Sequence, residues 1–600
     1  MRGDSLADLR VEGDMASGGL PRWWLLALIA IAAAVRLAYF LDFRASPYYL
    51  WPLLDARAYH EQALGFIAGT WPGSAPFFQD PGYSVGLAAV YQIFGPSPVF
   101  VIVMQMLLGT LLPVLVVWLA WRVLPASPRR APAAALAGLA YALCAPPLFY
   151  EVLLVKTSVV VFVSCLHLAL LMEMSRRVAS NALMHTWVFV VGTLLGALIV
   201  LRGNYLVLAP LFFVWLAWAL HRGTWRTTLT RALMYPLGAI AVVAPFTIHN
   251  YNVSDEFIIS SSHSGASFYL GNNPSNHSGS YGRPRWLRAD PSVEQSDFER
   301  QAEAVTGHTF SAHELSRYWF EQSMDWWREQ PSDAIALTVK KSKRWLDGNE
   351  GGDNYDFDFV KRYFAPSLNV APITGYFALP FGWAAIALIS LGLARYAGFT
   401  DPVLPASSFG NKPLMLLVGF VIAYSLSIIA FFVFGRYRIP IYAPLLVLGV
   451  PLLYTTLCNL FQGVRWQAIP ALLAVALVAI PVVRPMFSDD AVALRAQGDS
   501  VALYNIGVMA LEARKPSEAF RFFNAALATG STAPVVVLNI ARELESVGQW
   551  DTAAQLYRHA LAVDGGDGDT WQALARVLAK AGDTANAARA LARADSLERR

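Results

Sequence analysis

Long apolar runs, separated by short polar segments, make up most of the first 485 residues. They lie at roughly 21–41, 98–121, 132–149, 152–173, 186–201, 204–220, 231–248, 371–394, 413–434, 439–460 and 468–484. A helix needs about 20 predominantly apolar residues to cross the hydrocarbon core of a bilayer. The pattern therefore predicts an α-helical polytopic membrane protein with about eleven transmembrane helices. No small-residue cleavage motif ends the first run, so we interpret it as a transmembrane helix and not as a signal peptide.

The distribution of Lys and Arg orients these spans. With residues 1–21 as a cytoplasmic tail, basic residues gather in every second connecting segment, as the positive-inside rule requires. The loops 42–97 and 249–370, and everything after Pro485, then lie on the opposite, periplasmic side. Much Ala and Arg with little Lys is typical of a GC-rich bacterial genome, so we expect the inner (plasma) membrane of a bacterium.

Residues 486–600 follow a different pattern, in which small and large apolar residues recur every 34 positions. The superposed sets are Leu503, Val537 and Trp571; Gly507, Ala541 and Ala575; Ala519, Ala553 and Ala587; and Ala526, Ala560 and Ala594. Small residues where paired helices touch are typical of tetratricopeptide repeats. An ordinary helical bundle would not repeat them at one fixed offset. We therefore predict an all-α tetratricopeptide-repeat solenoid that binds a protein partner.

Composition narrows the range of functions. Apolar residues make up 56% of the chain and charged residues 15%, and the net charge is only +4, so nothing indicates a nucleic-acid partner. The three cysteines all fall within apolar runs, which fits packing positions and not a disulfide framework or a thiolate metal site.

The first outer loop carries the most informative polar residues. Asp55, Tyr59, Gln62 and Phe66 are spaced to share one face of a helix at the membrane surface. Asp80 precedes Pro81, which favours an extended or turn conformation. Two carboxylates on one loop suit an enzyme that removes a proton from one group and orients another. The alternative is that each carboxylate is simply solvated.

Several short motifs resemble one family. The first loop combines the Asp55 and Tyr59 pair with Pro81-Gly-Tyr83 and Ile93-Phe-Gly95. The later segments are Tyr150-Glu151 with Lys156-Thr157, Leu201-Arg202-Gly-Asn204, Tyr269-Leu-Gly-Asn272-Asn273-Pro274 and Gly435-Arg436-Tyr437-Arg438-Ile-Pro440. Their order and topology resemble the GT-C glycosyltransferases, most closely the protein mannosyltransferase and aminoarabinose transferase branch. The resemblance covers about residues 20–460, within the predicted membrane domain 22–485.

The resemblance implies a reaction and roles for the acidic residues. The family moves a sugar from a polyprenyl-phosphate carrier, and the Asp of its first outer loop, here Asp55, acts as the catalytic base in an inverting displacement. A second acidic residue often follows the first directly, but Ala56 occupies that place here. The second acidic role therefore passes to Asp80.

Basic residues at the predicted outer ends of spans suit the donor phosphate. They are Lys156, Arg202, Arg436 and Arg438. Negative charge builds on the leaving phosphate, so fixed cations should meet it there, and a divalent metal ion is another candidate for that role. The alternative for each basic residue is snorkelling, in which a side chain at a helix end reaches for lipid head groups.

Further residues are candidates for lining the substrate pocket, and they are Tyr59, Glu151, Asn204, His249, Asn250, Asn272 and Asn273. Glu151 has structural ion pairing as its alternative, and His249 and Asn250 have helix capping. The turn-rich run around Asn272 and Asn273 is interpreted as a flexible acceptor loop.

We therefore expect a membrane glycosyltransferase that acts on a protein, lipid or glycan acceptor at the periplasmic face of the bilayer. A non-catalytic scaffold, in which the spans anchor the repeats for envelope or polysaccharide assembly, is the first alternative. An O-antigen ligase-like enzyme is the second, although such enzymes centre their chemistry on a late outer loop.

Overall fold

The computed structural model describes residues 20–50, 52–176, 181–221, 223–284, 286–287, 293–350, 352, 354–393, 411–463, 465–483, 490–529, 534–563, 565 and 567–598. Within these ranges every regular element is helical, apart from one isolated bridge between Cys144 and Ile373. Most of the predicted cytoplasmic tail and the predicted domain boundary at Pro485 lie outside the described residues. The all-helical class is as predicted.

The chain divides into two compact units. Unit 1 comprises Met1–Ala45, Leu54–Asp353 and Phe364–Pro485, and unit 2 comprises Ser46–Leu53, Asn354–Tyr363 and Met486–Arg600. The helix pairs from α22 onward belong to unit 2, and two short segments of the outer loops belong to it as well. Sequence periodicity carries no sign of these two segments.

Unit 1 holds the apolar helices and the elements that connect them. They are α1 (Arg22–Phe43), α3 (Asp55–Ala68), α4 (Gly82–Phe94), α5 (Pro98–Val123), α6 (Arg130–Ala142), α7 (Ala145–Tyr150), α8 (Thr157–Met174), α9 (Asn181–Leu201), α10 (Tyr205–Leu220), α11 (Trp225–Ala232), α12 (Met234–Ser254), α13 (Ser264–Gly271), α14 (Glu294–Thr306), α15 (Ala312–Glu329), α16 (Pro331–Leu346), η2 (Pro366–Val370), α18 (Gly375–Ser390), α19 (Lys412–Ala430), α20 (Gly435–Phe461) and α21 (Arg465–Val483).

In the described part of the chain, seven helices are long and apolar enough to cross a membrane: α1, α5, α8, α9, α11 with α12 as one stretch, α19 and α20. Three of the other predicted runs form the shorter apolar helices α10, α18 and α21. The remaining run, 132–149, is divided into α6 and the short α7 near Cys144. Pro146 and Pro147 follow that break, and proline has no N–H to continue a helix. All eleven runs are thus helical, in a multi-pass membrane protein.

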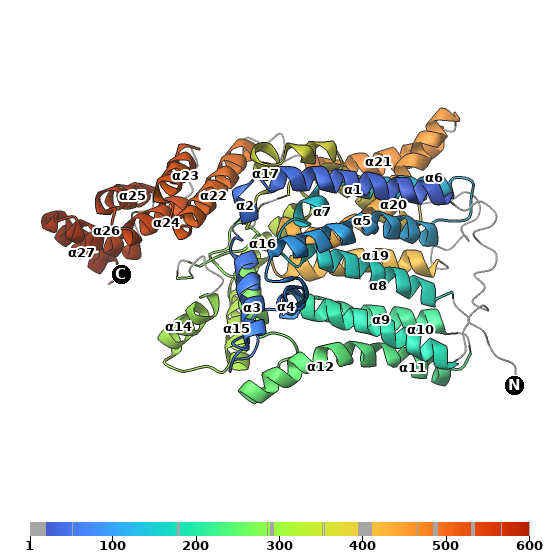
Figure 1. The fold of residues 1–600 in the computed structure, drawn as a ribbon, viewed down its shortest axis with the longest axis horizontal. Coiled ribbons are helices and arrows are strands. Elements are labelled where there is room, and N and C mark those ends of the chain that lie inside the picture. Colours follow the sequence, from blue (N-terminus) through green and yellow to red (C-terminus); the bar gives the residue numbers. More distant parts are fainter. Residues whose placement is uncertain are drawn as a thin grey trace. The chain divides into compact units, whose positions relative to one another are not determined.

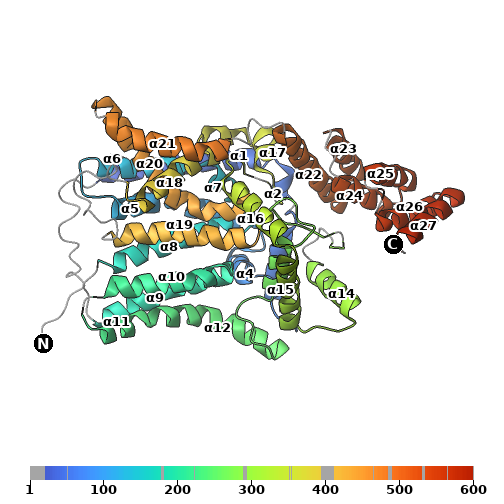
Figure 2. The ribbon, with the colours of Figure 1, turned by 180° about the vertical axis from the view of Figure 1, so that it is seen from behind.

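Both predicted outer loops fold at the same end of the helical bundle. Figure 1 shows the long helices of unit 1 lying side by side, with α3, α14 and α15 at one end and α11 at the opposite end. The view from behind in Figure 2 shows the same arrangement. We call the end that carries α3, α14 and α15 the outer end. The topology predicted from Lys and Arg likewise places the loops 42–97 and 249–370 on one side.

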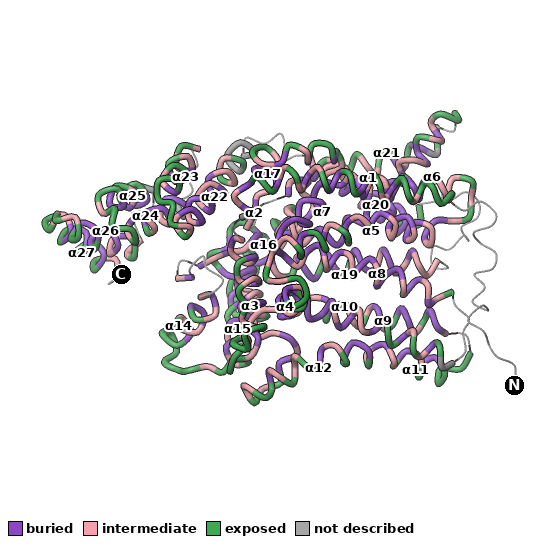
Figure 3. Tube along the Cα trace, viewed as in Figure 1, coloured by how far each residue is buried: buried purple, intermediate pink, exposed green. Residues whose placement is uncertain are grey.

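The helix α20 forms the centre of the bundle. It is the most buried of the candidate spans, whereas α1 and α12 are the least buried (Figure 3). Small and β-branched residues along α20, such as Ala443, Val447 and Gly449, are fully enclosed by neighbouring helices. A Cβ at Gly449 would approach the backbone of Phe381 and Gly382 within 2.9 Å, so glycine allows α18 to pack closely against α20. The residues at the start of α20 are thereby held in place at the outer end.

Unit 2 is built from helix pairs. Its elements are α2 (Pro47–Leu50), α17 (Phe357–Tyr363), α22 (Asp490–Glu512), α23 (Pro516–Ala528), α24 (Pro534–Ser546), α25 (Trp550–Val563), α26 (Gly568–Lys580) and α27 (Thr584–Glu598). The helices α23, α25 and α27 begin 34 residues apart, as do α24 and α26. Buried alanines and the aromatic side chains of Phe523 and Tyr557 form its core. The helix pairs follow the period seen in the sequence, and their membership of the tetratricopeptide family stays a prediction.

Short segments of the outer loops complete unit 2. The Tyr355 hydroxyl accepts a hydrogen bond from the Leu53 N–H at 3.1 Å, and its ring meets that of Tyr48 edge-on. Arg362 forms an ion pair of 2.5 Å with Asp499 on α22. These contacts explain why Ser46–Leu53 and Asn354–Tyr363 belong to the same unit as the helix pairs.

Candidate active site at the outer end of the bundle

The helix α3 presents Asp55 and Tyr59 from the first outer loop. Its buried positions are Ala56, Tyr59 and Ala63, at the i, i+3 and i+7 spacing of one helix face. Asp55 lies in the first turn, where a carboxylate is favoured by the helix dipole. Phe66, predicted to share a helix face with Asp55 and Tyr59, is 40% exposed.

Asp55 pairs with an arginine from the far end of the sequence. Arg436 Nη1 donates to Asp55 Oδ2 at 2.7 Å, and the two side chains are 13% and 15% exposed. Arg436 also lies over the rings of Phe434 and Tyr437, at 5.6 and 5.2 Å from their centroids. A charge-assisted hydrogen bond at this distance is strong and is sensitive to small shifts. The first outer loop is therefore fixed to the start of α20.

Asp80 is held by a second cation and by two further donors. Lys156 Nζ donates to Asp80 Oδ2 at 2.9 Å, the Gly203 N–H donates to the same oxygen at 3.2 Å, and Ser261 donates to Oδ1 at 3.1 Å. Burial alone would raise the pKa of the Asp80 carboxyl. The charge of Lys156 and the three hydrogen bonds outweigh burial, so the pKa lies below its usual value. Asp80 is thus an ionised carboxylate at neutral pH.

Tyr59 connects the two carboxylates. Its phenol is buried, its ring meets Tyr83 edge-on at 5.1 Å, and Asp55, Asp80, Arg436 and Tyr437 all act on it electrostatically. Burial and the nearby Asp55 charge raise its pKa far above the usual value, so Tyr59 stays protonated. Both carboxylates therefore lie near one phenol.

Arg202 adds a third cation. Its Nη1 donates to the Tyr424 hydroxyl at 2.8 Å, and its guanidinium lies 4.9 Å from the centroid of the Tyr437 ring. Its Nε and Nη2 atoms are buried and have no hydrogen-bond partner within the described structure. Buried N–H groups usually have partners, and leaving one unpaired costs about 1–3 kcal/mol. Arg202 therefore holds donors available for an anion.

We call this group of side chains the outer cluster, and its members are Asp55, Tyr59, Asp80, Lys156, Arg202, Arg436 and Tyr437. Asn204 lies two residues beyond Arg202, and its amide donates to Ser427 Oγ at 3.0 Å. Six of the predicted site residues thus meet in one place, drawn from the first outer loop, the start of α8, the end of α9 and the start of α20.

Arg438 lies apart from the outer cluster. It is 1% exposed, forms an ion pair with Glu350 at 3.1 Å, and donates to the carbonyl oxygens of Asp347 and Asn349. Residues two apart on a helix point in different directions, so Arg436 and Arg438 cannot face one ligand together. The structure therefore does not bring Arg438 to the other predicted phosphate-binding residues, and Arg438 organises the segment after α16.

Glu151 is also structural. Arg36 of α1 forms an ion pair of 2.7 Å with it, and both side chains are almost fully buried. Gln105 donates to the Glu151 carbonyl at 3.0 Å, which fixes the turn after α7. Structural pairing, the alternative stated for Glu151 from the sequence, is what the structure supports, with Arg36 as the partner.

Asn250 and His249 contact Phe77, which lies three residues before Asp80 in the chain. The Asn250 amide accepts from the Phe77 N–H at 2.9 Å and donates to the carbonyls of Ile258 and Ser260. His249 packs its ring 4.9 Å from Phe77. Asn250 is fully buried, so it positions the backbone near Asp80 and does not line a pocket.

Asn272 and Asn273 likewise satisfy backbone groups. Asn272 donates to the carbonyls of Phe268 and Ala430 and accepts from Lys341 Nζ at 2.8 Å. Asn273 donates to the carbonyls of Tyr269 and Gly282. Both are buried, so the expected flexible acceptor loop is instead a closely bonded turn.

Three residues that contact the predicted site residues were not themselves predicted. Ser261 and Tyr424 complete the environments of Asp80 and Arg202, and Arg36 neutralises Glu151. Arg36 carried a usable signal, because a lone charge within an apolar run usually has a partner. Ser261 and Tyr424 carried none, since their roles depend on tertiary contacts.

A divalent metal ion was the other candidate for meeting the donor phosphate. In the described residues, no three His, Cys, Asp or Glu side chains converge as metal ligands would. The carboxylates of the outer cluster are paired with Lys156 and Arg436.

Comparisons with known proteins concern only the fold. No known protein family matches the chain, and no curated protein matches it in sequence. It is similar to the apo oligosaccharyltransferase of Archaeoglobus fulgidus, at 15% identity and a TM-score of 0.42, over 78% of this chain and 55% of that one. The same organism's oligosaccharyltransferase AglB, in complex with an inhibitory peptide and a dolichol-phosphate, matches at 13% identity and a TM-score of 0.41, over 87% and 58%.

A bacterial structure is similar as well. ArnT from Cupriavidus metallidurans, bound to undecaprenyl phosphate, matches at 16% identity and a TM-score of 0.38, over 92% of this chain and 80% of that one. This chain spans somewhat more than half the length of the archaeal chains. With TM-scores of 0.38 to 0.42, the chemistry of the outer cluster rests on the residues of this chain.

Proposed function

We propose that unit 1 is a GT-C-type glycosyltransferase that moves a sugar from a polyprenyl-phosphate carrier to an acceptor hydroxyl or amine at the outer end of the bundle. The observation that carries the proposal is that two carboxylates, Asp55 and Asp80, lie near the Tyr59 phenol and are each paired with a cation. A third cation, Arg202, lies over the ring of Tyr437. Three cations against two carboxylates leave one positive charge, which suits a substrate with a phosphate.

Asp55 would act as the base. The acceptor oxygen or nitrogen attacks the anomeric carbon, the bond from that carbon to the phosphate oxygen breaks, and its electron pair leaves with the polyprenyl phosphate. The acceptor proton passes to Asp55, and the configuration at the anomeric carbon inverts. General base catalysis by a positioned carboxylate contributes roughly 10²–10⁴-fold.

The cations would stabilise the leaving group. Arg436 would exchange Asp55 for phosphate oxygens when the donor binds, which frees a carboxylate oxygen for the acceptor. Arg202 offers its Nε and Nη2 donors, which have no partner within the described structure. Lys156 stays with Asp80 and supplies fixed positive charge. Donors that are held in place before the reaction are worth most where charge develops.

The periplasmic side, the bacterial inner membrane and a protein, lipid or glycan acceptor belong to this proposal. The orientation follows from Lys and Arg in the connecting segments. A carrier lipid with a chain in the bilayer and a phosphate at its surface fits a site at the end of apolar helices.

The test is Asp55→Asn in the purified full chain, reconstituted with a polyprenyl-phosphate sugar and assayed for transfer. Glu61→Gln is the matched control, because Glu61 lies on the same helix in an exposed ion pair with Arg57. We expect Asp55→Asn to lose at least a hundredfold of activity and Glu61→Gln to lose less than twofold. Activity of Asp55→Asn within threefold of the wild type would refute the proposal.

A non-catalytic scaffold is the second candidate, because the helix pairs of unit 2 recur with the period typical of partner-binding repeats. Removing residues 486–600 is a poor test, since unit 2 also contains Ser46–Leu53 and Asn354–Tyr363. The better test is complementation of a deletion strain by Asp55→Asn. A scaffold would complement fully, and an enzyme would not.

A further inference from the structure

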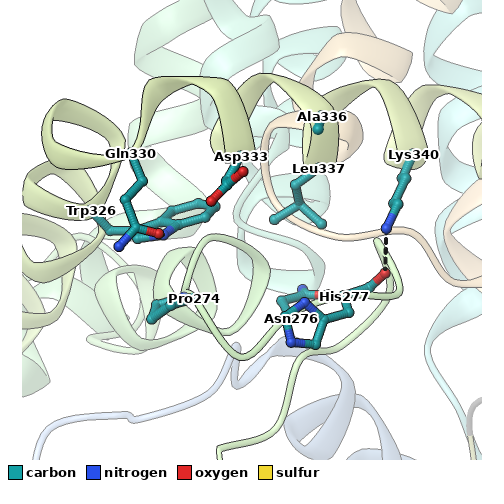
Figure 4. Close-up of a pocket in the computed structure, with 9 residues that line it drawn as sticks. All are labelled: Pro274, Asn276, His277, Trp326, Gln330, Asp333, Ala336, Leu337 and Lys340. Atoms are coloured by element: carbon teal, nitrogen blue, oxygen red, sulfur yellow. Dashed lines mark hydrogen bonds between the residues drawn. The ribbon is translucent and has the colours of Figure 1, made fainter.

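A small pocket lies in the second outer loop, outside the outer cluster. It has a volume of about 140 Å³ and is lined by Pro274, Asn276, His277, Trp326, Gln330, Asp333, Ala336, Leu337 and Lys340. Figure 4 shows the α16 side chains of Asp333, Leu337 and Lys340 directed toward the turn that carries Pro274 and His277. The pocket is therefore a space between α16 and this turn, closed on one side by the end of α15.

The walls of this pocket are fixed by hydrogen bonds. The Asn276 amide donates to the carbonyls of Leu270 and Ser280 and accepts from the Gly279 N–H. Lys340 Nζ donates to the His277 carbonyl at 3.3 Å, and Trp326 Nε1 donates to Gln330 at 3.2 Å. A site whose polar groups are already placed loses less entropy when a ligand binds.

The lining is chemically mixed and electrically balanced. Trp326, Leu337 and Pro274 provide apolar surface, while the carboxylate of Asp333 and the ammonium of Lys340 carry opposite charges. No hydrogen bond or ion pair within the described chain engages the Asp333 carboxylate. The pocket thus offers both acceptors and donors without net charge, which suits a neutral ligand with many hydroxyl groups and not a phosphate.

The pocket wall packs against the segment that leads into the outer cluster. The turn after α13 contacts residues 430–433, because Asn272 donates to the Ala430 carbonyl at 3.0 Å and the Val433 N–H donates to the Gly279 carbonyl at 3.2 Å. Arg436 follows three residues after Val433. The backbone of residues 430–436 therefore connects the pocket wall to Arg436, the cation that pairs with Asp55.

We propose that this pocket binds one neutral sugar unit of the acceptor, and the proposal rests on the glycosyltransferase function above. Ligand sites for drug-sized molecules measure roughly 300–1,000 Å³, so a pocket of this size accommodates a single ring of a longer chain. Trp326 and Leu337 meet the apolar side of the ring, and Asp333, Gln330 and Lys340 bind its hydroxyl groups. The pocket would hold the acceptor chain while its end reaches the outer cluster.

The variant Ala336→Trp tests this by filling the pocket. Ala336 is exposed and lines the space, so a larger side chain there should not disturb the core. Ile335→Trp is the matched control, because Ile335 is 59% exposed and does not line the pocket. Thermal unfolding and gel filtration of both variants verify that each is folded.

Binding is measured without catalysis, on the full-length Asp55→Asn protein, by saturation-transfer NMR with glucose, galactose, mannose and N-acetylglucosamine as probes. We expect at least one sugar to bind, its signal to fall at least fivefold in Ala336→Trp, and its signal to persist in Ile335→Trp. Absence of binding by all four sugars, or equal signals in the two tryptophan variants, would overturn the pocket proposal.

The transfer assay separates the two proposals. If transfer requires Asp55, Ala336→Trp should raise the acceptor KM at least tenfold and leave the donor KM within twofold. An unchanged acceptor KM in that case overturns the pocket and leaves the glycosyltransferase function intact. If Asp55→Asn stays active, the NMR result still decides whether the pocket binds sugars.

Discussion

Arg436 Nη1 lies 2.7 Å from Asp55 Oδ2, although 381 positions separate the two residues in the chain. The pair joins the first turn of α3 to the first turn of α20. Neither side chain is fully buried, since 13% of Arg436 and 15% of Asp55 are exposed. In the proposed reaction the substrate opens this ion pair, which frees the base and the phosphate-binding cation.

Replacing Arg436 by Gln should weaken donor binding more than acceptor binding. The change removes a cation from the proposed phosphate site and leaves Asp55 unpaired. We expect the donor KM to rise at least tenfold while the acceptor KM changes less than threefold, measured by initial rates of transfer. The control is Arg57→Gln, an exposed residue of α3 paired with Glu61, which should leave both constants unchanged.

The pair of Asp80 and Lys156 should behave as a coupled unit. Asp80→Asn leaves Lys156 uncompensated in a site where both side chains are 16% exposed, and should destabilise unit 1 by about 2–4 kcal/mol. Lys156→Met in the same protein should recover part of that loss, because the unpaired charge is gone. Chemical denaturation of both single variants and the double variant gives the coupling energy. If the losses of stability in the two single variants add up to the loss in the double variant, Asp80 and Lys156 are not coupled. Asp325→Asn, in an exposed pair with Arg328, should cost less than about 1 kcal/mol.

The sequence predicted the helical class, the apolar runs and six members of one polar site. These predictions rest on local features, namely run length, the spacing of Asp55 and Tyr59, and charges at the ends of spans. Asp80, Lys156 and Arg202 could be proposed for the same reason, since each stands beside a predicted span or turn.

The errors share one physical cause, which is that a motif does not show which way its side chains point. Arg436 and Arg438 stand two residues apart, so on a helix one faces the outer cluster and the other faces Glu350. Asn272 is polar in a turn-rich segment, yet it is buried because backbone carbonyls around it need donors. Such roles follow from tertiary packing, and the sequence alone carries no record of it.

The buried pair of Arg36 and Glu151 explains a glycine in α5. A Cβ added at Gly109 would lie 2.2 Å from the Glu151 carboxylate. Gly109→Ala should therefore displace Glu151 from Arg36 and destabilise the protein by about 1–3 kcal/mol, seen as a lower unfolding temperature. Gly86→Ala is the control, since no atom lies within 4 Å of its added Cβ. Equal unfolding temperatures in the two variants would contradict the close approach.

Lys341 should make stability depend on pH. Burial lowers its pKa to about 7, and its amine donates to the neutral Asn272 side chain. The unfolded chain keeps the Lys proton up to a pKa near 10.4, so the folded state binds fewer protons between about pH 7 and 10. The contribution of Lys341 to stability is therefore least favourable below pH 7 and improves as the pH rises through that window.

Lys341→Met should remove this dependence. We expect it to increase the free energy of unfolding at pH 6 by on the order of 2–4 kcal/mol, seen as a higher unfolding temperature. The effect at pH 9.5 should be smaller. Trp327 still donates to Asn272 in the variant, so the acceptor keeps a partner. Lys343→Met, at an exposed position of the same helix, should show no such pH dependence. A gain that is equal at both pH values would exclude the buried charge as its cause.

Leu54 directly precedes Asp55 and has φ = 47° and ψ = −113°, a backbone conformation that residues with a Cβ rarely adopt. Such strain costs of order 1–3 kcal/mol and is often found at functional sites, where the surrounding structure enforces it. Leu54→Ala removes the side chain and keeps the Cβ, whereas Leu54→Gly removes both. We therefore expect Leu54→Gly to be more stable than Leu54→Ala by about 1–2 kcal/mol in chemical denaturation.

If the strain orients Asp55 toward the acceptor, the glycine variant should also lose transfer activity relative to the alanine variant, because its backbone can relax. Equal activity in the two variants, with the stability difference present, would show that the strain does not serve the positioning of Asp55.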